Sequence, residues 1–314
     1  MRNAFADEVT QLAKQDPRVV LLSGDIGNKL FDDFKQVDPA RFLNCGIAEA
    51  NMMGVAAGMA LSGFRPIIYT ITPFTTTRCF EQIRVDVCYH EAPVIIVGTG
   101  SGLSYTELGP THHSLEDMAI LRTLPGMKVI APCDAAELRF ALRAALQQDN
   151  PVYIRIGKKG EPDVQSHLSS ITLGKASVVR EGHKVAILSA GTVMCEALKA
   201  ADMLKEHGIT AEVVSFHTIK PLDEEYLRKT VDNFELIVTL EEHGMIGGLY
   251  GAVAEWYVKT EAKIPLLGIG TPDEFMHDIG TQEYARKKYG LVAENIVTRI
   301  LDRLKREEKN AHRI

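Results

Sequence analysis

The chain has 314 residues, of which 46% are hydrophobic and 24% charged, and its formal net charge at pH 7 is −6. This length favours two domains of ordinary size, and the acidic balance argues against nonspecific binding to nucleic acid or to an anionic membrane. No run of 18 apolar residues is present, so no membrane span is expected. Residues 1–16 include acidic residues and no apolar stretch, which predicts an amphipathic helix and not a signal peptide. The five cysteines form no CxxC pair, so neither structural zinc nor a disulfide framework is expected, and a cytoplasmic location is.

Short apolar runs rich in β-branched residues alternate with helical stretches through the first half of the chain. Such strands, separated by helices, are typical of a parallel sheet covered on both faces. The predicted strands are 18–25, 65–71, 92–99, 128–132 and 151–157. The predicted helices between them are 48–62, 77–89 and 135–148.

The pattern changes in the polar segment 158–176, which has no hydrophobic periodicity and is predicted to contain a linker. A second series then begins, with predicted strands and one helix, 194–208, that ends at a glycine suited to a C-cap. These strands are 183–192, 210–216, 236–243 and 264–270. We therefore expect an α/β protein of two doubly wound domains with mainly parallel sheets, comprising residues 1–165, a linker at 166–182, and residues 183–314.

Glu49 is the one carboxylate in the segment 44–68, which consists mostly of small and apolar residues. Glutamate is rarely fully buried unless it is paired or has a function. One interpretation is a charge at a helix N-terminus, which the helix macrodipole favours. The other is a carboxylate in a dry site, where it can keep or share a proton. Composition and spacing leave both interpretations open.

Phe74 follows a proline in the loop 70–78, directly after a predicted strand. An aromatic residue in such a loop is more often part of the core than a platform for a ligand. Arg78 opens the next predicted helix, where the macrodipole disfavours a cation. Its position therefore indicates an anionic partner.

The glycine-rich segment 98–114 follows a third predicted strand and contains His112 and His113. Loops of this length in compact domains tend to be functional. The segment matches neither the dinucleotide-binding nor the phosphate-binding glycine motif, and the histidine pair lacks a third metal ligand at useful spacing. Because ligands bind at the carboxyl ends of strands in open α/β sheets, we expect one site built from Glu49, the Phe74 loop and the His112 loop.

Taken together, these segments resemble the C-terminal half of transketolase and its relatives. The stretch "GIAEANMMGVAAGMALSGFRPI" resembles the family segment that holds a cofactor-activating glutamate, and "TPFTTTRCFEQIRVDV" resembles the loop and helix after it. "ELGPTHHSLEDMAILRTLPGMKVIAPCD" resembles the segment around the family's G-P-T-H motif, and "LEEHGMIGGLYGAV" resembles its C-terminal domain. The similarity runs in order over nearly the whole chain. It implies a pyrimidine-binding domain followed by a transketolase C-terminal domain.

Members of this family use thiamine diphosphate, with Mg²⁺ on the diphosphate. The resemblance implies that Glu49 hydrogen-bonds N1′ of the aminopyrimidine and that Phe74 stacks on the pyrimidine ring. It implies that His112 contacts the donor substrate beside C2 of the cofactor, so that Glu49 and His112 are the expected catalytic residues. Asp25 and the adjacent Ile26 are expected near the cofactor.

The resemblance also implies a set of substrate-binding residues. Arg155 matches an arginine that holds the acceptor's phosphate, and Arg2 and Arg78 lie where relatives place phosphate-binding arginines. His113 and its neighbour His112 complete the set. The implied reaction is the transfer of a two-carbon ketol unit from a ketose, phosphorylated in the expected case, to an aldehyde.

Full-length transketolase binds the diphosphate and the metal in an N-terminal domain with a G-D-G…N motif, and "SGDIG" in this chain is not that motif in that context. The resemblance therefore implies one subunit of a split enzyme. A separate N-terminal subunit would hold the diphosphate and Mg²⁺, so no metal ligand is expected in this chain. Because the family's sites lie between two such domains, an α2β2 heterotetramer is expected.

Departures from the transketolase pattern keep other activities open. Leu108 replaces an aspartate that reads the donor's hydroxyl, and Thr77 replaces an aromatic residue. The stretch "TTTRCFEQIRVDV" is also similar to 1-deoxyxylulose-5-phosphate synthase, and "THHS" is similar to the β subunits of 2-oxoacid or acetoin dehydrogenases. A catalytically idle partner subunit is a further alternative, and the retention of Glu49, Phe74 and His112 argues against it.

Overall fold

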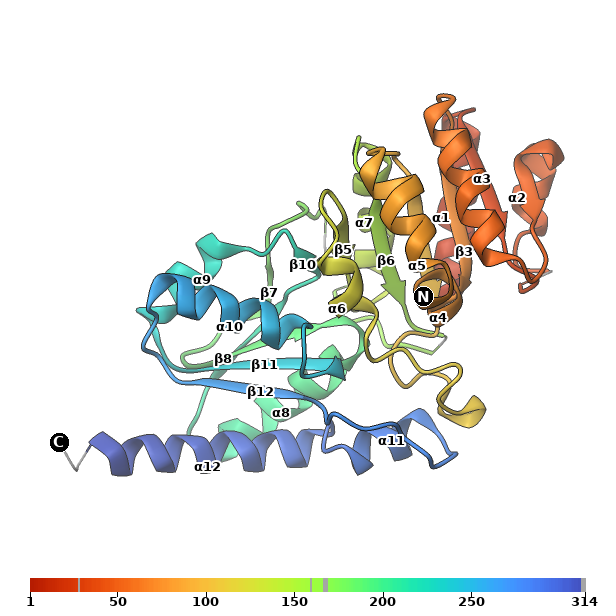
Figure 1. The fold of residues 1–314 in the computed structure, drawn as a ribbon. Helices are drawn as coiled ribbons and strands as arrows, with labels where there is room; N and C mark the ends of the chain where they lie inside the picture. The colour runs from red at the N-terminus through yellow and green to blue at the C-terminus, as the bar shows by residue number, and fades with distance from the viewer. Residues whose placement is uncertain (28, 159, 166–168, 312–314) are drawn as a thin grey trace.

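The computed structural model describes residues 1–27, 29–158, 160–165 and 169–311. Residues 166–168, which belong to the expected linker, lie outside these ranges. The chain forms two α/β domains, each built on a mainly parallel sheet with helices on both faces (Figure 1). This architecture confirms the expected fold class.

A seven-stranded sheet forms the centre of the first domain. Its strands are β1 (Val19–Ser23), β2 (Phe42–Asn44), β3 (Arg65–Ile71), β4 (Ile95–Thr99), β5 (Lys128–Ile130), β6 (Val152–Ile156) and β10 (Thr218–Lys220). They lie in the order β10-β5-β6-β4-β3-β1-β2, and all neighbours are parallel except β10 and β5. β1, β3, β4 and β6 are buried along their whole length, as expected where helices cover both faces of a parallel sheet.

Helices pack on both faces of this sheet. They are α1 (Arg2–Gln15), α2 (Asp32–Val37), α3 (Glu49–Leu61), α4 (Thr72–Thr75), α5 (Phe80–Gln82), α6 (Asp117–Arg122) and α7 (Ala135–Leu146), with 3₁₀ turns at Pro39–Arg41, Thr77–Cys79 and Thr106–Leu108 and a π-helix at Ile83–Tyr89. α1 and α7 cover one face, over a core that includes Phe5 and Leu138. α3 and the π-helix cover the other face, over a core that includes Met52 and Val87.

A five-stranded sheet forms the centre of the second domain, in the order β12-β11-β8-β9-β7. Its strands are β7 (Ser177–Arg180), β8 (Lys184–Ala190), β9 (Ala211–Ser215), β11 (Phe234–Gly244) and β12 (Leu266–Thr271). The helices are α8 (Met194–Glu206), α9 (Glu224–Val231), α10 (Leu249–Thr260), α11 (Gln282–Lys288) and α12 (Ala293–Ala311), with a 3₁₀ turn at Gly191–Val193. α9 and α10 lie on one face of the sheet, and α8 and α12 lie on the other (Figure 1).

Two strands differ from the arrangement expected from the sequence. β7 falls within the segment 166–182, and it pairs antiparallel with β9, so this part of the expected linker belongs to the second sheet. β10 comes from the second half of the chain but joins the first sheet, with Thr218 opposite Ile130 of β5. Strands this short carry too little hydrophobic pattern to be assigned from sequence alone.

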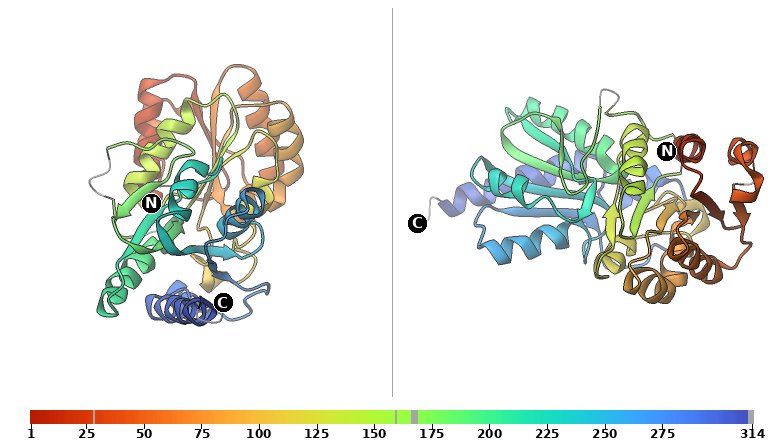
Figure 2. Two further views of the ribbon diagram at one scale, coloured as in Figure 1. Left: turned by 90° about the vertical axis from the view of Figure 1, so that its left-hand side faces the viewer. Right: turned by 90° about the horizontal axis from the view of Figure 1, so that it is seen from above.

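One hydrophobic core runs across the boundary between the domains. It joins Ile68 and Met118 of the first domain to Phe216, Leu249 and Trp256 of the second. The domains therefore pack as one body, with α2 and the end of α12 at opposite ends of the molecule (Figures 1 and 2). All five cysteines are free thiols. Within the described ranges, no helix is both long enough and apolar enough to cross a membrane.

Candidate active site

The carboxyl ends of four strands meet at one edge of the first sheet. In the strand register, Ser23 of β1 lies opposite Tyr69 of β3, Ile71 of β3 opposite Thr99 of β4, and Thr99 opposite Ile156 of β6. The chain runs from β1 outward to β2 and then returns to β3 on the other side of β1, so the strand order reverses here. Ligands bind in open α/β sheets outside the carboxyl ends of the strands at such a reversal.

Glu49 is the first residue of α3, and its side chain is buried at this edge. Its Oε2 accepts a hydrogen bond of 2.9 Å from Nη1 of Arg78, whose side chain is 43% exposed. The Glu49 charge also lies near the Cys79 thiol, because burial and then this carboxylate raise the pKa of Cys79 to about 12. Glu49 is therefore a buried carboxylate with one cationic partner that reaches it from solvent.

The small residues after Glu49 leave one face of α3 open. Within the described part of the chain, a Cβ placed on Gly58 would meet nothing within 4 Å, and one on Gly54 would only contact Asp86 at 3.7 Å. α3 is nearly as apolar on its exposed side as on its buried side, and it carries the exposed Val55. The close packing that these small residues permit therefore does not occur within this chain.

Phe74 lies at the centre of a group of side chains. The guanidinium carbon of Arg78 is 4.0 Å from the centre of the Phe74 ring, a cation–π contact. The His112 ring meets the Phe74 ring edge-on, with 5.3 Å between centroids and 67° between planes. The structure therefore brings Glu49, Arg78, Phe74 and His112 together, although they come from three separate loops.

His112 is half-buried in the loop that follows β4. Its Nδ1 lies 2.9 Å from Oγ1 of Thr111, and its ring lies 6.2 Å from the ring of Tyr105. Burial and then the positive charge of Arg78 lower the pKa of His112. The imidazole is therefore mainly neutral near pH 7, which suits exchange of a proton with a bound molecule.

Two residues beside His112, Tyr105 and Lys158, were not expected from the sequence. Lys158 follows β6, and its Nζ lies 4.7 Å from the centre of the Tyr105 ring. Lys158 also forms an ion pair with Glu107. The sequence places Lys158 at the start of a polar linker segment, and only its position directly after a buried strand could have indicated a site.

His113 points to a different part of the molecule. It is 5% exposed, burial lowers its pKa, and its Nε2 has no hydrogen-bond partner among the described residues. It lines a cavity of about 490 Å³ between its own loop and two loops of the second domain, around Met245 and Phe275. The structure therefore separates His113 from the group around Phe74.

Arg155 also lies apart from that group. Its guanidinium is 3% exposed and forms a bidentate ion pair with Asp117, with Nε–Oδ2 and Nη2–Oδ1 distances of 2.8 and 3.1 Å. Nη2 also donates to the carbonyl oxygens of Ser114 and Glu242, at 2.9 and 3.3 Å. Burial opposes both charges, but their attraction leaves the pKa of Arg155 raised and that of Asp117 lowered. A guanidinium held in this way has no free face for an acceptor phosphate, so this geometry does not support the role expected for Arg155.

The remaining expected residues lie around the edge. Asp25 is exposed at the end of β1, where its Oδ1 accepts a hydrogen bond of 3.2 Å from Asn44 Nδ2. Ile26 is half-buried and packs against the core under α1. Arg2 begins α1; burial raises the pKa of Tyr69, and the charge of Arg2 opposes this. These contacts are with the strand ends and the core, and the cofactor and substrate roles of the three residues stay predictions.

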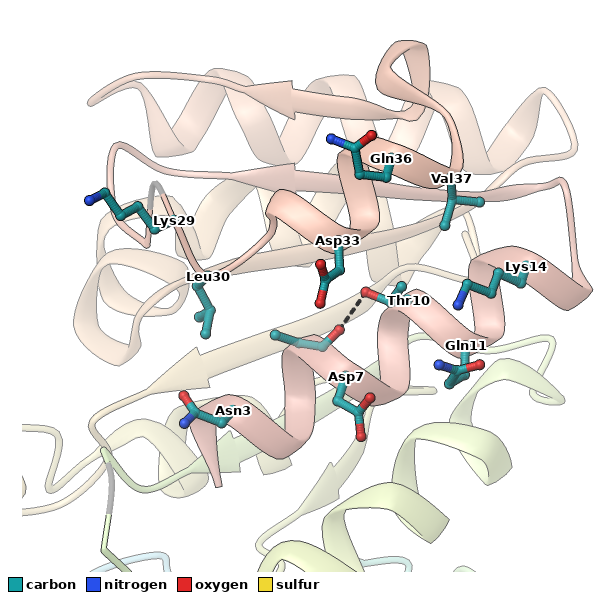
Figure 3. Close-up of a pocket in the computed structure, with 11 residues that line it drawn as sticks. Asn3, Asp7, Thr10, Gln11, Lys14, Lys29, Leu30, Asp33, Gln36 and Val37 are labelled. Atoms are coloured by element: carbon teal, nitrogen blue, oxygen red, sulfur yellow. Dashed lines mark hydrogen bonds between the residues drawn. The ribbon is translucent and has the colours of Figure 1, made fainter.

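A groove of about 550 Å³ lies between α1 and α2 (Figure 3). Figure 3 shows Asp7 and Asp33 facing one another across it, with Lys14 and Lys29 toward its two ends. None of the expected site residues lines this groove. It is therefore separate from the group around Phe74.

Comparison with known proteins covers nearly the whole chain. Residues 1–161 match the family model for the transketolase pyrimidine-binding domain, and residues 174–296 match that for the transketolase C-terminal domain. One of the two subunits of apulose-4-phosphate transketolase of Phocaeicola vulgatus is 38% identical over 308 residues, which are 97% of each chain. A 6-deoxy-6-sulfo-D-fructose transketolase subunit of a Clostridium species is 39% identical, over 95% of this chain and 92% of that protein.

A solved structure described as a split-gene transketolase, an inactive β4 tetramer, is 36% identical to this chain. It superposes with a TM-score of 0.87 over 96% of both chains. The chain also matches 1-deoxy-D-xylulose-5-phosphate synthase of a Synechococcus species at 35% identity. That match covers 94% of this chain but only 46% of the synthase.

Proposed function

Because the chain belongs to the transketolase family, with its pyrimidine-binding and C-terminal domains in one polypeptide, we propose that it acts as the C-terminal subunit of a split transketolase. Such an enzyme transfers a two-carbon ketol unit from a ketose to an aldehyde. Relatives of nearly the same length are named as separate transketolase subunits, which supports this proposal. The observation that carries it is the convergence of a buried Glu49, the Phe74 ring and a neutral His112 at the sheet edge.

The site residues fit the aminopyrimidine end of the family's cofactor. In this structure the planar guanidinium of Arg78 covers the Phe74 ring and donates a hydrogen bond to Glu49. A planar, donor-bearing heterocycle can make the same two interactions. Arg78 is 43% exposed, and ion pairs of this kind contribute about 0–1 kcal/mol, so its displacement costs little. Thiamine diphosphate, when bound, supplies a carbanion at C2 of its thiazolium ring.

The chain's own residues would prepare this chemistry. Glu49 would hold a proton shared with N1′, because a buried carboxylate away from water can keep or give up a proton. Phe74 would present an aromatic face to the pyrimidine. His112, with its lowered pKa, would exchange a proton with the donor sugar's hydroxyl or carbonyl.

We further propose that a separate N-terminal subunit holds the diphosphate and Mg²⁺, in an α2β2 assembly in the cytoplasm. The open face of α3 next to Glu49 supports a partner at this edge, since its small residues accept close packing. The free state of all five cysteines is compatible with a reducing compartment.

The relatives' names suggest the class of substrate. One acts on a sugar with a terminal phosphate and the other on a sugar with a terminal sulfonate, so both substrates carry an anionic end. We propose that this enzyme also takes a ketose with an anionic end. Arg78, once displaced from Glu49, and Lys158 provide the cations beside His112 that would bind it.

The proposal is tested by assaying ketol transfer with thiamine diphosphate and Mg²⁺, using the chain alone and the chain co-purified with an N-terminal transketolase subunit from the same genome. Activity is expected only from the pair, with a sugar phosphate as donor. Full activity of the lone chain would contradict the split enzyme. Consumption of pyruvate with release of CO₂ by the pair, without ketol transfer, would favour the synthase activity instead.

A further inference from the structure

A carboxylate of the second domain reaches the base of the loop that carries His112. Glu242, in β11, is 2% exposed, and its Oε1 accepts a hydrogen bond of 2.7 Å from the backbone N–H of Leu103. Leu103 lies in the loop of the first domain that follows β4, and its side chain is buried in the core of the second domain. The loop is therefore attached to the second domain by its backbone and by a side chain.

Gly102 shows how close this approach is. Its φ is +64°, and a Cβ at this position would lie 2.5 Å from Oε1 and 2.8 Å from the carbonyl oxygen of Glu242. Contacts this short are not sustained by real side chains, so only glycine fits here. The loop is pressed directly against Glu242.

Arg155 forms a second attachment beside the first. Nη2 donates to the carbonyl oxygens of Ser114 and Glu242, while Asp117 neutralises the guanidinium from the other side. Gly102 and Ser114 exchange both backbone hydrogen bonds, at 3.1 and 3.0 Å, and so close the loop at its base. Ser114 is two residues from His112, so both attachments act on the segment that sets the position of the imidazole.

Glu242 is itself held by groups on α11. It forms an ion pair with Arg286 and accepts a hydrogen bond of 2.9 Å from Nε2 of Gln282. Gln282 Nε2 also lies 3.3 Å from Oγ of Ser104, in the same loop. The carboxylate is thus fixed on its own domain and presents one oxygen to the loop.

We propose that Glu242 is a positioning residue for His112, so that the second domain organises the catalytic loop of the first. This inference rests on the proposed function for its effect on turnover, but the attachment of the loop can be measured without any activity. The second domain then has a role in the reaction although no residue of it touches the substrate.

The attachment is tested by hydrogen–deuterium exchange on the isolated chain. In Glu242→Ala, amides of the segment 100–114 are expected to exchange about ten- to a hundredfold faster, the factor for one lost buried hydrogen bond to a carboxylate. Glu242→Gln keeps an oxygen for Leu103 and should stay closer to the wild type. Gly102→Ala, which forces the loop away from Glu242, should reproduce the effect of Glu242→Ala with the carboxylate in place.

Glu241→Ala is the matched control. Glu241 is the neighbouring buried glutamate on β11, and its carboxylate accepts hydrogen bonds of 2.7 and 2.8 Å from the backbone of Leu249 and Tyr250 in the second domain. This variant should loosen the start of α10 and leave the segment 100–114 unchanged. Equal exchange of that segment in wild type and Glu242→Ala, or equal loosening in both variants, would overturn the inference whatever the activity.

The effect on His112 is measured in the complex with the N-terminal subunit, as turnover per bound cofactor. Glu242→Ala is expected to lower kcat by about ten- to a hundredfold, as a displacement of a catalytic group by about 1 Å does, with cofactor affinity unchanged because Glu49 and Phe74 lie on other elements. A looser loop with unchanged kcat would refute the positioning role. Absence of ketol transfer in the wild-type complex would count against the proposed function, while the exchange result still decides the attachment.

Discussion

Replacing Arg155 with methionine is expected to lower the free energy of unfolding by about 3–5 kcal/mol, the cost of breaking a buried ion pair by removing one partner. Methionine fills most of the space of the arginine stem, so a cavity adds little. The main loss is electrostatic, because Asp117 is 1% exposed and keeps only the hydrogen bond of 2.6 Å from the Tyr153 hydroxyl among the side-chain contacts near Arg155. The carbonyl oxygens of Ser114 and Glu242 also lose a donor.

The assay is urea-induced unfolding of the isolated chain at pH 7, followed by circular dichroism. Arg84→Ala is the control, since the Arg84–Glu81 pair is exposed and such pairs often contribute nothing measurable. The double variant Asp117→Leu/Arg155→Met should recover much of the lost stability, because no unpaired charge remains buried. A loss below about 1 kcal/mol for Arg155→Met, together with a KM raised only for phosphorylated acceptors, would refute this reasoning and restore the phosphate-binding role.

Three loops of the first domain carry the remaining predictions. Phe74→Ala should weaken cofactor binding in the complex by about 1–3 kcal/mol, or about ten- to a hundredfold, since a stacking platform is lost; the exposed Tyr89→Ala is the control, and unchanged affinity in calorimetric titration would mean that Phe74 is only a core residue. Arg78→Gln should raise the pKa of His112, because removing a nearby positive charge favours the imidazolium. An NMR titration of the isolated chain measures this, and a pKa that stays the same or falls would show that Arg78 does not act on the imidazole.

The edge of the sheet could be predicted from the sequence because each part follows a recognisable local pattern. Glu49, Phe74 and His112 all come directly after apolar strands, and parallel strands bring their carboxyl ends to one edge. Periodicity alone left Glu49 open between a helix charge and a site residue. The structure adds that Arg78 reaches the same carboxylate and the same ring, a pairing of side chains 29 residues apart in sequence that no local pattern contains.

The contacts between the domains could not be predicted in this way. Arg155 meets Asp117 and the backbone of Glu242 because β6 ends beside the start of β11's final turn, which is a consequence of how two sheets pack. β10 and β7 are three and four residues long, so their sheet membership depends on neighbours distant in sequence. Glu242 was within a predicted strand, where nothing in the sequence distinguishes a carboxylate that holds a loop from one that caps a helix.

The central claim is that Glu49 activates the cofactor from this chain, and exchange of the C2 proton of bound thiamine diphosphate tests it most directly. The rate is measured by quenched-flow NMR in the complex with the N-terminal subunit, for wild type and for Glu49→Gln, which preserves the side chain's shape. The account predicts exchange slower by about 10²–10⁴-fold in the variant, the usual worth of positioned proton transfer, with the complex still assembled and cofactor still bound. Equal exchange rates in the two complexes would contradict it and leave Glu49 as a charge at the start of a helix.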